Sequence, residues 1–372
     1  GTRLDHDIPD DLMAKSRKAL TVDDLDDDRF YKYIFMNRSD RGEWVSNYKA
    51  SKALKILKAK PLTENNKPVM YLRGHDGSTL GYAHNKLFMI NPYSNTQVRI
   101  VYSSGNLSSG VVLHHENWHF VTLAPQTYFY KAHMCMRHGM INHGLTKNSF
   151  VRYIKECRRA IAYPMEEDIQ VFFVPGEGKQ AFAAIEDMVE RSPYIDMAAH
   201  RFTNRSLINL LKENIEDRRL KVRLVVDDDM YWSKYERRED GRYNRYPNMP
   251  FEMDNVNDLF FSGYTRASAQ QPAQMLFQAQ YMETNHWSRL LHHNKFIVAR
   301  DQDKNVTGVF CGAGNFTTAA FTKNYENFYY IEVPEVLEAF DKQYDYLWSI
   351  STSYSNMPKV NALPNGESPL LD

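Results

Sequence analysis

The sequence predicts an α/β fold made of two pseudo-symmetric repeats, in which mixed or largely parallel sheets are flanked by helices. Three observations predict it. One block of residues occurs twice in the same order, apolar positions in the second half follow strand and helix patterns, and 372 residues suffice for two domains. Hydrophobic residues make up 43% of the chain, which is enough for a buried core and argues against disorder.

The repeated block spans about forty residues and carries three matched motifs. The first copy reads H-N-K at 84–86, G-N-L at 105–107 and E-N-W at 116–118; the second reads H-N-K at 293–295, G-N-F at 314–316 and E-N-F at 326–328. A short apolar strand can imitate one H-x-K motif by chance. It does not reproduce three motifs in one order, so the sequence indicates an internal duplication.

Predicted elements in the second copy follow the order strand, helix, strand, helix, strand. Alternating and helical apolar spacings place them at 169–173, 181–191, 194–202, 207–215 and 222–226. This βαβ order predicts a parallel sheet covered by helices. In the first copy, residues 21–24 match 225–228, so that repeat begins after its opening strand. Either the native chain is longer, which we favour, or this repeat is reduced.

We therefore expect an N-terminal repeat at 1–160 that lacks its first strand, a C-terminal repeat at 161–350 and a tail at 351–372. Residues 230–290 are the least regular part and are rich in aromatic side chains. A long irregular segment of this kind is either a surface insertion or a wall that faces the substrate.

The repeated residues suit the cleavage of a phosphodiester. Histidine and lysine two positions apart on a strand point to the same face. One histidine cannot attack phosphorus and also protonate the leaving oxygen on the opposite side. His84 and His293, one from each copy, can do both in line.

Matched polar residues are expected to hold the phosphate. The ammonium groups of Lys86 and Lys295 would bind its non-bridging oxygens, with the amides of Asn106 and Asn315 beside them. Small residues would let backbone N–H groups approach the anion; the predicted substrate-binding residues are Ser104, Gly105, Gly314 and Thr317.

Glu116 and Glu326 are expected to hold one ring nitrogen of a histidine and so to fix its tautomer. In this hypothesis each histidine acts with the lysine, asparagine and glutamate of its own copy. The remaining histidines lack such matched context, and most are expected to be structural or exposed. His292 would point to the opposite face of its strand from His293.

No metal or other cofactor is expected, because no H-E-x-x-H motif or cysteine–histidine ligand spacing occurs. The three cysteines, Cys135, Cys157 and Cys311, allow one disulfide at most and leave the compartment open. No apolar run is long enough to span a membrane. A secreted or periplasmic location is favoured if an upstream targeting sequence has been removed.

The two motif blocks resemble the phospholipase D superfamily, whose mark is a duplicated H-x-K-x4-D followed by G-S-x-N. The resemblance covers about residues 21–332, and the stretch 312–327 is similar to the bacterial endonuclease branch. It implies a covalent phosphohistidine, with His84 as the nucleophile and His293 as the general acid and then the general base.

Two departures from the family motifs stand out. The motif aspartate is replaced by Asn91 in the first copy and by Arg300 in the second. The motif serine is kept as Ser104 but replaced by Ala313. In the family that aspartate supports the reacting groups, so an active enzyme is expected. The alternative is an inactive homologue that binds phosphate.

The substrate is the open question. A phospholipid would need apolar walls, which residues 230–290 could supply, whereas a nucleic acid would need a basic track with aromatic platforms. Lysine plus arginine and aspartate plus glutamate each total 46, giving a net charge of +0, which disfavours nucleic acid. We favour a phospholipid and peripheral membrane contact, with an endonuclease as the alternative. Both motifs lie in one chain, which predicts a monomer.

Overall fold

The computed structural model describes residues 36–38, 44–46, 62–64, 67–70, 73, 80–106, 114–228, 230–231, 249–264, 275–282 and 291–356. The match expected at 21–24, and the part of the expected tail beyond 356, lie outside the described residues. Among these residues, no helix combines the length and the apolar character needed to cross a membrane.

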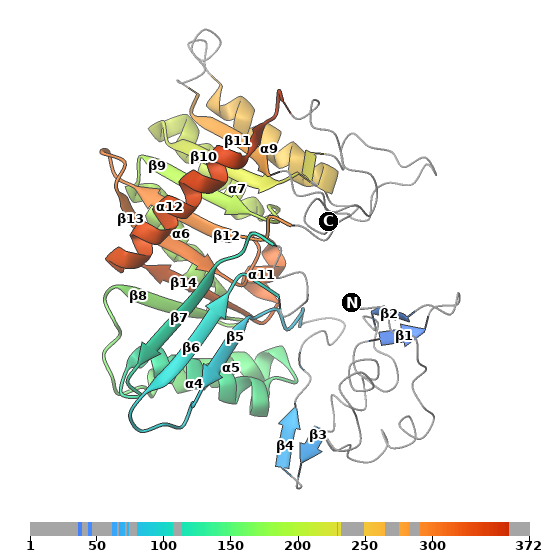
Figure 1. The fold of residues 1–372 in the computed structure, drawn as a ribbon, viewed down its shortest axis with the longest axis vertical. Coiled ribbons are helices and arrows are strands. Elements are labelled where there is room, and N and C mark those ends of the chain that lie inside the picture. Colours follow the sequence, from blue (N-terminus) through green and yellow to red (C-terminus); the bar gives the residue numbers. More distant parts are fainter. Residues whose placement is uncertain are drawn as a thin grey trace, which may run out of the picture.

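A single mixed sheet of eight strands forms most of the second half, in the order β15-β11-β10-β9-β12-β13-β14-β8 (Figure 1). Its strands are β8 (Ile169–Val174), β9 (Tyr194–Ala199), β10 (Lys221–Asp227), β11 (Phe277–Met282), β12 (Lys295–Arg300), β13 (Val306–Gly312), β14 (Glu326–Ile331) and β15 (Thr352–Ser353). Within this sheet β10 pairs in parallel with both β9 and β11, and the other neighbouring strands pair antiparallel.

The strands and helices of the expected βαβ series are present. However, β8 and β9, which that series predicts as neighbouring parallel strands, do not lie side by side. β8 lies at the edge of the sheet, because β12, β13 and β14 are inserted between it and β9 as antiparallel strands. Local periodicity identifies a strand but carries no information on which distant strand lies beside it. The predicted α/β fold is confirmed, and of the two sheet types expected, mixed or largely parallel, the sheet is mixed.

Helices cover both faces of this sheet. On one face lie α6 (Gly178–Arg191), α7 (Arg205–Arg218), α9 (Met249–Gly263) and the short α11 (Thr318–Thr322); α12 (Pro334–Ile350) crosses the other face. Strand β14 shows why its last four residues are all apolar or aromatic. Phe328 and Tyr330 pack into the hydrophobic core on the α6 side of the sheet, and Tyr329 and Ile331 pack into the core on the α12 side.

The described parts of residues 230–290 are more regular than their sequence indicated. Within the described part, α9 and β11 are both regular elements, and β11 pairs with β10 along its whole length. The reason is visible in Met253, Val256 and Leu259, which recur every three residues on one face of α9 and are buried. The high density of aromatic residues around this pattern concealed it.

The first half contains a three-stranded antiparallel sheet of β5 (Leu87–Ile90), β6 (Val98–Ser103) and β7 (Trp118–Leu123). It also contains β1 (Met36–Arg38) paired with β2 (Trp44–Ser46), and β3 (Leu62–Glu64) paired with β4 (Lys67–Met70). Helices α4 (Tyr128–His143) and α5 (Lys147–Arg159) follow and are joined by a disulfide between Cys135 and Cys157. Cys311 is a buried free thiol.

Buried neutral histidines make the fold sensitive to acid. Burial lowers the pKa of His133 and His292 to about 3 and that of His119 to about 4. The unfolded chain binds protons near pH 6.5 while these folded sites do not, so their contribution to stability is complete above pH 6.5 and is lost as the pH falls.

We expect each of these histidines to remove about 2 kcal/mol of unfolding free energy between pH 7 and pH 5. Urea denaturation at several pH values measures this loss. His133→Gln removes one titrating site. The slope of unfolding free energy against pH should therefore fall by the amount that corresponds to one bound proton. An unchanged slope in that variant would contradict the explanation.

Candidate active site

The two copies meet through two equivalent backbone contacts. The His84 N–H donates to the Tyr325 carbonyl at 3.0 Å, and the His293 N–H donates to the His115 carbonyl at 3.0 Å. Tyr325 and His115 directly precede the motif glutamates. Each motif histidine therefore lies beside the motif glutamate of the other copy, and the same arrangement occurs twice, as a duplication requires.

The histidine–glutamate pairs cross between the copies. His84 Nδ1 lies 2.8 Å from Glu326 Oε2, and His293 Nδ1 lies 2.8 Å from Glu116 Oε1. The expectation that each histidine uses the glutamate of its own copy is wrong, because the backbone contacts bring together residues that are remote in sequence. A carboxylate that accepts from Nδ1–H leaves the Nε2 lone pair for other chemistry.

Both glutamates are buried and held through their second oxygen. Ser104 Oγ donates to Glu116 Oε2 at 2.6 Å, and Asn324 Nδ2 donates to Glu326 Oε1 at 2.9 Å. The Ser104 backbone N–H also donates to Asn117 Oδ1 at 3.1 Å. Ser104 was predicted to bind substrate; its hydroxyl holds Glu116 and its N–H binds Asn117.

The lysines lie next to the histidines and bind their backbone. Lys86 Nζ donates to the His84 carbonyl at 2.6 Å, and Lys295 Nζ donates to the His293 carbonyl at 2.5 Å. Burial lowers the pKa of Lys86 to about 8 and that of Lys295 well below its ordinary value. Buried ammonium groups of this kind attract an anion that replaces their lost hydration.

The electrostatics place the histidines and lysines in one site. The charges of Lys295, Lys86 and His84 all lower the pKa of His293, after burial as the largest cause. Burial also lowers the pKa of His84, and Glu326 partly opposes this shift. Both imidazoles are therefore mainly neutral at pH 7 in the free protein, and either Nε2 can act as a nucleophile.

The predicted asparagines and Thr317 lie outside these contacts. Asn106 is half-buried three residues after β6. Asn315 Oδ1 is buried and accepts no hydrogen bond from any described residue. Thr317 is the N-cap of α11, where its hydroxyl accepts from the Ala320 N–H at 3.3 Å. This contact gives Thr317 a structural role at the start of α11.

The motif glycines are required by close packing. A Cβ atom on Gly314 would lie 2.2 Å from the Phe328 ring, and Gly312 has a φ of +152°. The Gly105 N–H donates to Ser103 Oγ at 2.7 Å. At Gly314 the small residue thus lets the chain pass over Phe328, whereas at Gly105 the backbone N–H is engaged by Ser103.

Two histidines near His293 were not predicted. The ring centroids of His200 and His114 lie 4.6 Å and 6.0 Å from that of His293. His200 follows directly after β9, where Ala199 pairs with Lys295 of β12. The pairing of β9 with β12 brings His200 beside His293, and the bridge between His115 and His292 brings His114 there. The one sequence signal was the position of His200 at the end of a predicted strand.

Both replacements of the motif aspartate have structural explanations. Arg300 Nε lies 2.6 Å from Asp196 Oδ2, and Arg223 Nε lies 2.7 Å from Asp196 Oδ1. Arg300 is the last residue of β12, at the opposite end from His293. Asn91 follows β5 in a turn with a φ of +53°, a conformation that asparagine tolerates well.

The crossed pairing can be tested by titration. Glu326→Gln removes a charge that favours protonated His84, so we expect the pKa of His84 to fall and that of His293 to change little. Glu116→Gln should act mainly on His293. NMR titration of the two imidazoles in both variants measures these shifts. A larger effect of each variant on the histidine of its own copy would contradict the crossed geometry.

Among the described residues, no three side chains of histidine, cysteine, aspartate or glutamate are arranged to hold a metal ion. Residues 185–348 match the family model "Cardiolipin synthase, PLD-like domain". This range contains His293, Lys295 and Glu326. A search of curated proteins returned no match.

Several solved structures are similar. Phosphatidylserine synthase from Haemophilus influenzae is 12% identical with a TM-score of 0.50, over 75% of this chain and 64% of that chain. Nuc from Salmonella typhimurium, a phospholipase D family member, is 23% identical with a TM-score of 0.35, over 50% and 97%. NucT from Helicobacter pylori is 14% identical with a TM-score of 0.34, over 50% and 98%. Residues 185–348 thus match a phospholipase D-like domain, and the fold of the chain is similar to that of the phosphatidylserine synthase.

Proposed function

We propose that the protein cleaves a phosphodiester through a covalent phosphohistidine, without a metal ion. The crossed pairing of His84 with Glu326 and of His293 with Glu116 is the observation that carries this proposal. Two imidazoles with fixed tautomers, each with its own buried lysine, supply a nucleophile, an acid and an anion site.

The first step forms a bond between His84 Nε2 and phosphorus and breaks the bond from phosphorus to the leaving oxygen. His293 donates the proton that this oxygen takes up. In the second step a water oxygen attacks phosphorus, the P–N bond breaks and His293 accepts the proton of the water. The greater exposure of the His84 side chain, 22% against 4% for His293, supports its role as the nucleophile that meets the substrate.

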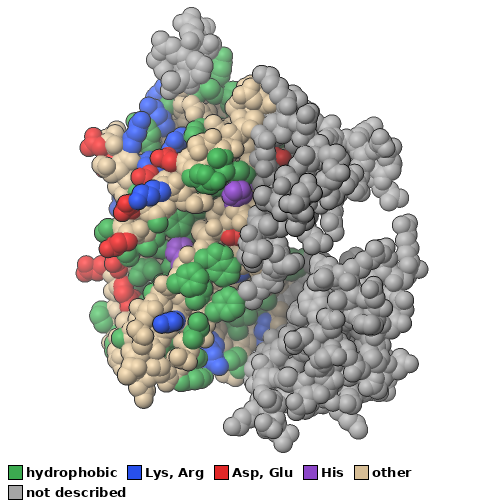
Figure 2. All heavy atoms as spheres, in the orientation of Figure 1, with side chains coloured by type: hydrophobic (Ala, Val, Ile, Leu, Met, Phe, Trp, Pro, Cys, Tyr) green, Lys and Arg blue, Asp and Glu red, His purple; other side chains and the backbone are tan. Residues whose placement is uncertain are grey.

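A phospholipid is the substrate class we favour. The matching family model is named for cardiolipin synthase, which supports lipid chemistry. On the face shown in Figure 2, acidic and basic side chains are interspersed over the described surface, with no extended basic stripe. That pattern fits the net charge of +0 and gives little support for tracking a nucleic acid backbone.

An endonuclease is the second candidate, because residues 312–327 are similar to the bacterial endonuclease branch. An inactive homologue that binds phosphate is the third, because Asn91 and Arg300 replace the motif aspartates.

The substrate experiment uses one buffer with EDTA for all substrates. The full chain is incubated with phospholipid vesicles of defined head groups, with supercoiled plasmid and with single-stranded DNA. We expect release of a soluble head group and no nicking. His293→Ala should abolish release, whereas His138→Ala, a change on α4, should not. Nicking without head-group release would favour the endonuclease, and no reaction would favour the inactive homologue.

The pH dependence of kcat/KM follows from the role of one histidine as the general acid. The histidine that protonates the leaving group must carry a proton, and burial lowers the pKa of both candidates from the ordinary value of about 6.5. The protonated fraction therefore falls as the pH rises, so we expect kcat/KM to drop about tenfold per pH unit above roughly pH 6.5. Steady-state rates on a soluble phosphodiester from pH 4.5 to 8.5 measure this. A rate that rises across that range would contradict the acid role.

A further inference from the structure

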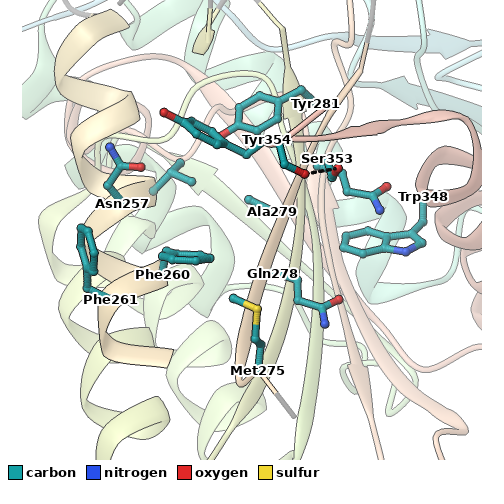
Figure 3. Close-up of a pocket in the computed structure, with 13 residues that line it drawn as sticks. Asn257, Phe260, Phe261, Met275, Gln278, Ala279, Tyr281, Trp348, Ser353 and Tyr354 are labelled. Carbon is teal, nitrogen blue, oxygen red and sulfur yellow. Dashed lines mark hydrogen bonds between the residues drawn. The ribbon is translucent and has the colours of Figure 1, made fainter. Parts of the chain in front are cut away.

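A cavity of about 640 Å³ lies beside the edge of the eight-stranded sheet, between α9, β11 and the end of α12 (Figure 3). Its volume lies within the usual range of small-molecule sites. Most of its walls are apolar; the large side chains are Phe260, Phe261, Met275, Tyr281, Trp348 and Tyr354.

Figure 3 shows how these side chains surround the cavity. Phe260 and Phe261 extend from α9 on one side, and the Trp348 indole lies on the other side. Tyr354 lies near Tyr281 at one end, and Met275 lies toward the other. A guest between these walls would have apolar surface on both sides along an elongated path.

The rim of the cavity exposes aromatic surface. Phe261 is 72% exposed, Tyr264 is 48% exposed and Tyr354 is 43% exposed. The ring centroids of Phe260 and Phe261 lie 5.9 Å apart, and those of Phe260 and Tyr264 lie 6.1 Å apart. Exposed aromatic side chains beside the mouth of a cavity are typical of a surface that binds an apolar ligand.

A second cavity of about 490 Å³ shares Met275 and Gln278 with the first and is polar. Lys221 and Lys304 line it, and their ammonium groups lie 5.2 Å and 5.9 Å from the Tyr194 ring centroid. Neither lysine forms an ion pair with a carboxylate among the described residues. The apolar cavity therefore adjoins a polar cavity that contains two ammonium groups.

The carboxylates of the polar cavity are already neutralised. Asp196 lies between Arg300 and Arg223, at 2.6 Å and 2.7 Å from their Nε atoms. Asp341 pairs with Arg300 at 2.6 Å, and Asp345 lies 3.5 Å from Arg223. These contacts leave Lys221 and Lys304 as the charge available to a ligand, and that charge favours an anion.

The cavities are separate from the histidine site. Strand β11 carries the wall of the apolar cavity, and β10 and β9 lie between it and β12, which begins at Lys295. Three strand spacings of about 4.8 Å make a separation of roughly 14 Å across the sheet. The polar cavity reaches β12 only at Arg300, at the opposite end of that strand from His293. Gln280 adds a polar group to the apolar wall, because its Oε1 is buried and accepts no hydrogen bond from the described residues.

We propose that the two adjoining cavities bind one anionic amphiphile. Its acyl chain lies between α9 and α12, and its anionic head group lies beside Lys221 and Lys304. The apolar walls alone would accept many apolar ligands. The adjoining lysines select those whose chain ends in a carboxylate or a phosphate. This site does not depend on the histidines and therefore goes beyond the proposed hydrolysis.

Trp348 provides a direct measurement. Titration of the full chain with 11-bromoundecanoate should give saturable quenching of tryptophan fluorescence, because bromine quenches indoles that it contacts. We expect Trp348→Phe to remove most of this quenching. Ala279→Phe, which fills the cavity, should weaken binding at least tenfold while leaving hydrolysis of a soluble phosphodiester unchanged.

Head-group recognition has its own control. In Lys221→Ser/Lys304→Ser, binding of 11-bromoundecanoate should weaken about tenfold, whereas binding of the uncharged 11-bromoundecanol should not change. All titrations are repeated in His84→Ala, so that a failure of the proposed hydrolysis does not affect them. Equal affinity in Ala279→Phe and the wild type would overturn the proposal. A lipid-free dimer that Ala279→Phe dissociates would also overturn it and assign the cavity to a second copy.

Discussion

His84→Ala and His293→Ala should each lower kcat/KM by about 10⁴-fold or more, but only the second variant should accumulate a phosphoenzyme. In His293→Ala the nucleophile remains, so an activated diester with a good leaving group can still react with His84. The intermediate then persists, because no base activates the water that would hydrolyse it. Reactions with a ³²P-labelled substrate, stopped with detergent at alkaline pH, measure the adduct, which is stable in base and labile in acid.

Two comparisons make this experiment decisive. His138→Ala on α4 controls for loss of a histidine outside the site. The double variant of His84 and His293 should be no slower than His84→Ala alone, because residues that act as one unit are not additive. A phosphoenzyme in His84→Ala and none in His293→Ala would exchange the roles. An adduct in both variants would place the nucleophile elsewhere.

The sequence predicted which residues gather in the candidate site better than it predicted which of them are in contact. His84, Lys86, His293 and Lys295 stand in motifs that occur twice, and each motif lies within a few residues of chain. The partner of His84 is Glu326, which is 242 positions away. Repetition in sequence shows that two units exist, but only their docking decides which glutamate reaches which histidine.

The same limit applies to the rest of the site. His200 approaches His293 only because β9 pairs with β12. Gly314 was predicted to admit an anion, whereas its hydrogen faces the Phe328 ring in a contact that no local pattern contains. Apolar spacing did predict β8, α6, β9, α7 and β10. For each of these elements the pattern depends on near neighbours alone.

The buried lysines connect the stability of the fold with its chemistry. Lys295 lies in the interior, its pKa is lowered well below the ordinary value by burial, and its ammonium donates to the His293 carbonyl. In the unfolded chain the same ammonium is fully hydrated and holds its proton at neutral pH. The lowered pKa therefore means that this charge costs folding free energy at neutral pH. A cation maintained at such a cost is typical of a functional site.

Lys295→Met should therefore stabilise the protein by about 1–3 kcal/mol and lower kcat/KM by about 10³-fold. Methionine has a similar volume and needs no hydration, while the phosphate loses one of its two cations. Urea denaturation at pH 7 measures the first effect, and steady-state kinetics measure the second. Lys86→Met is the matched control, because burial lowers the pKa of Lys86 only to about 8 and its gain in stability should be smaller. If Lys295→Met destabilises the fold and retains activity, Lys295 is a structural residue held by its hydrogen bond to His293. A more stable but inactive protein would show that this lysine serves the anion site at the expense of the fold.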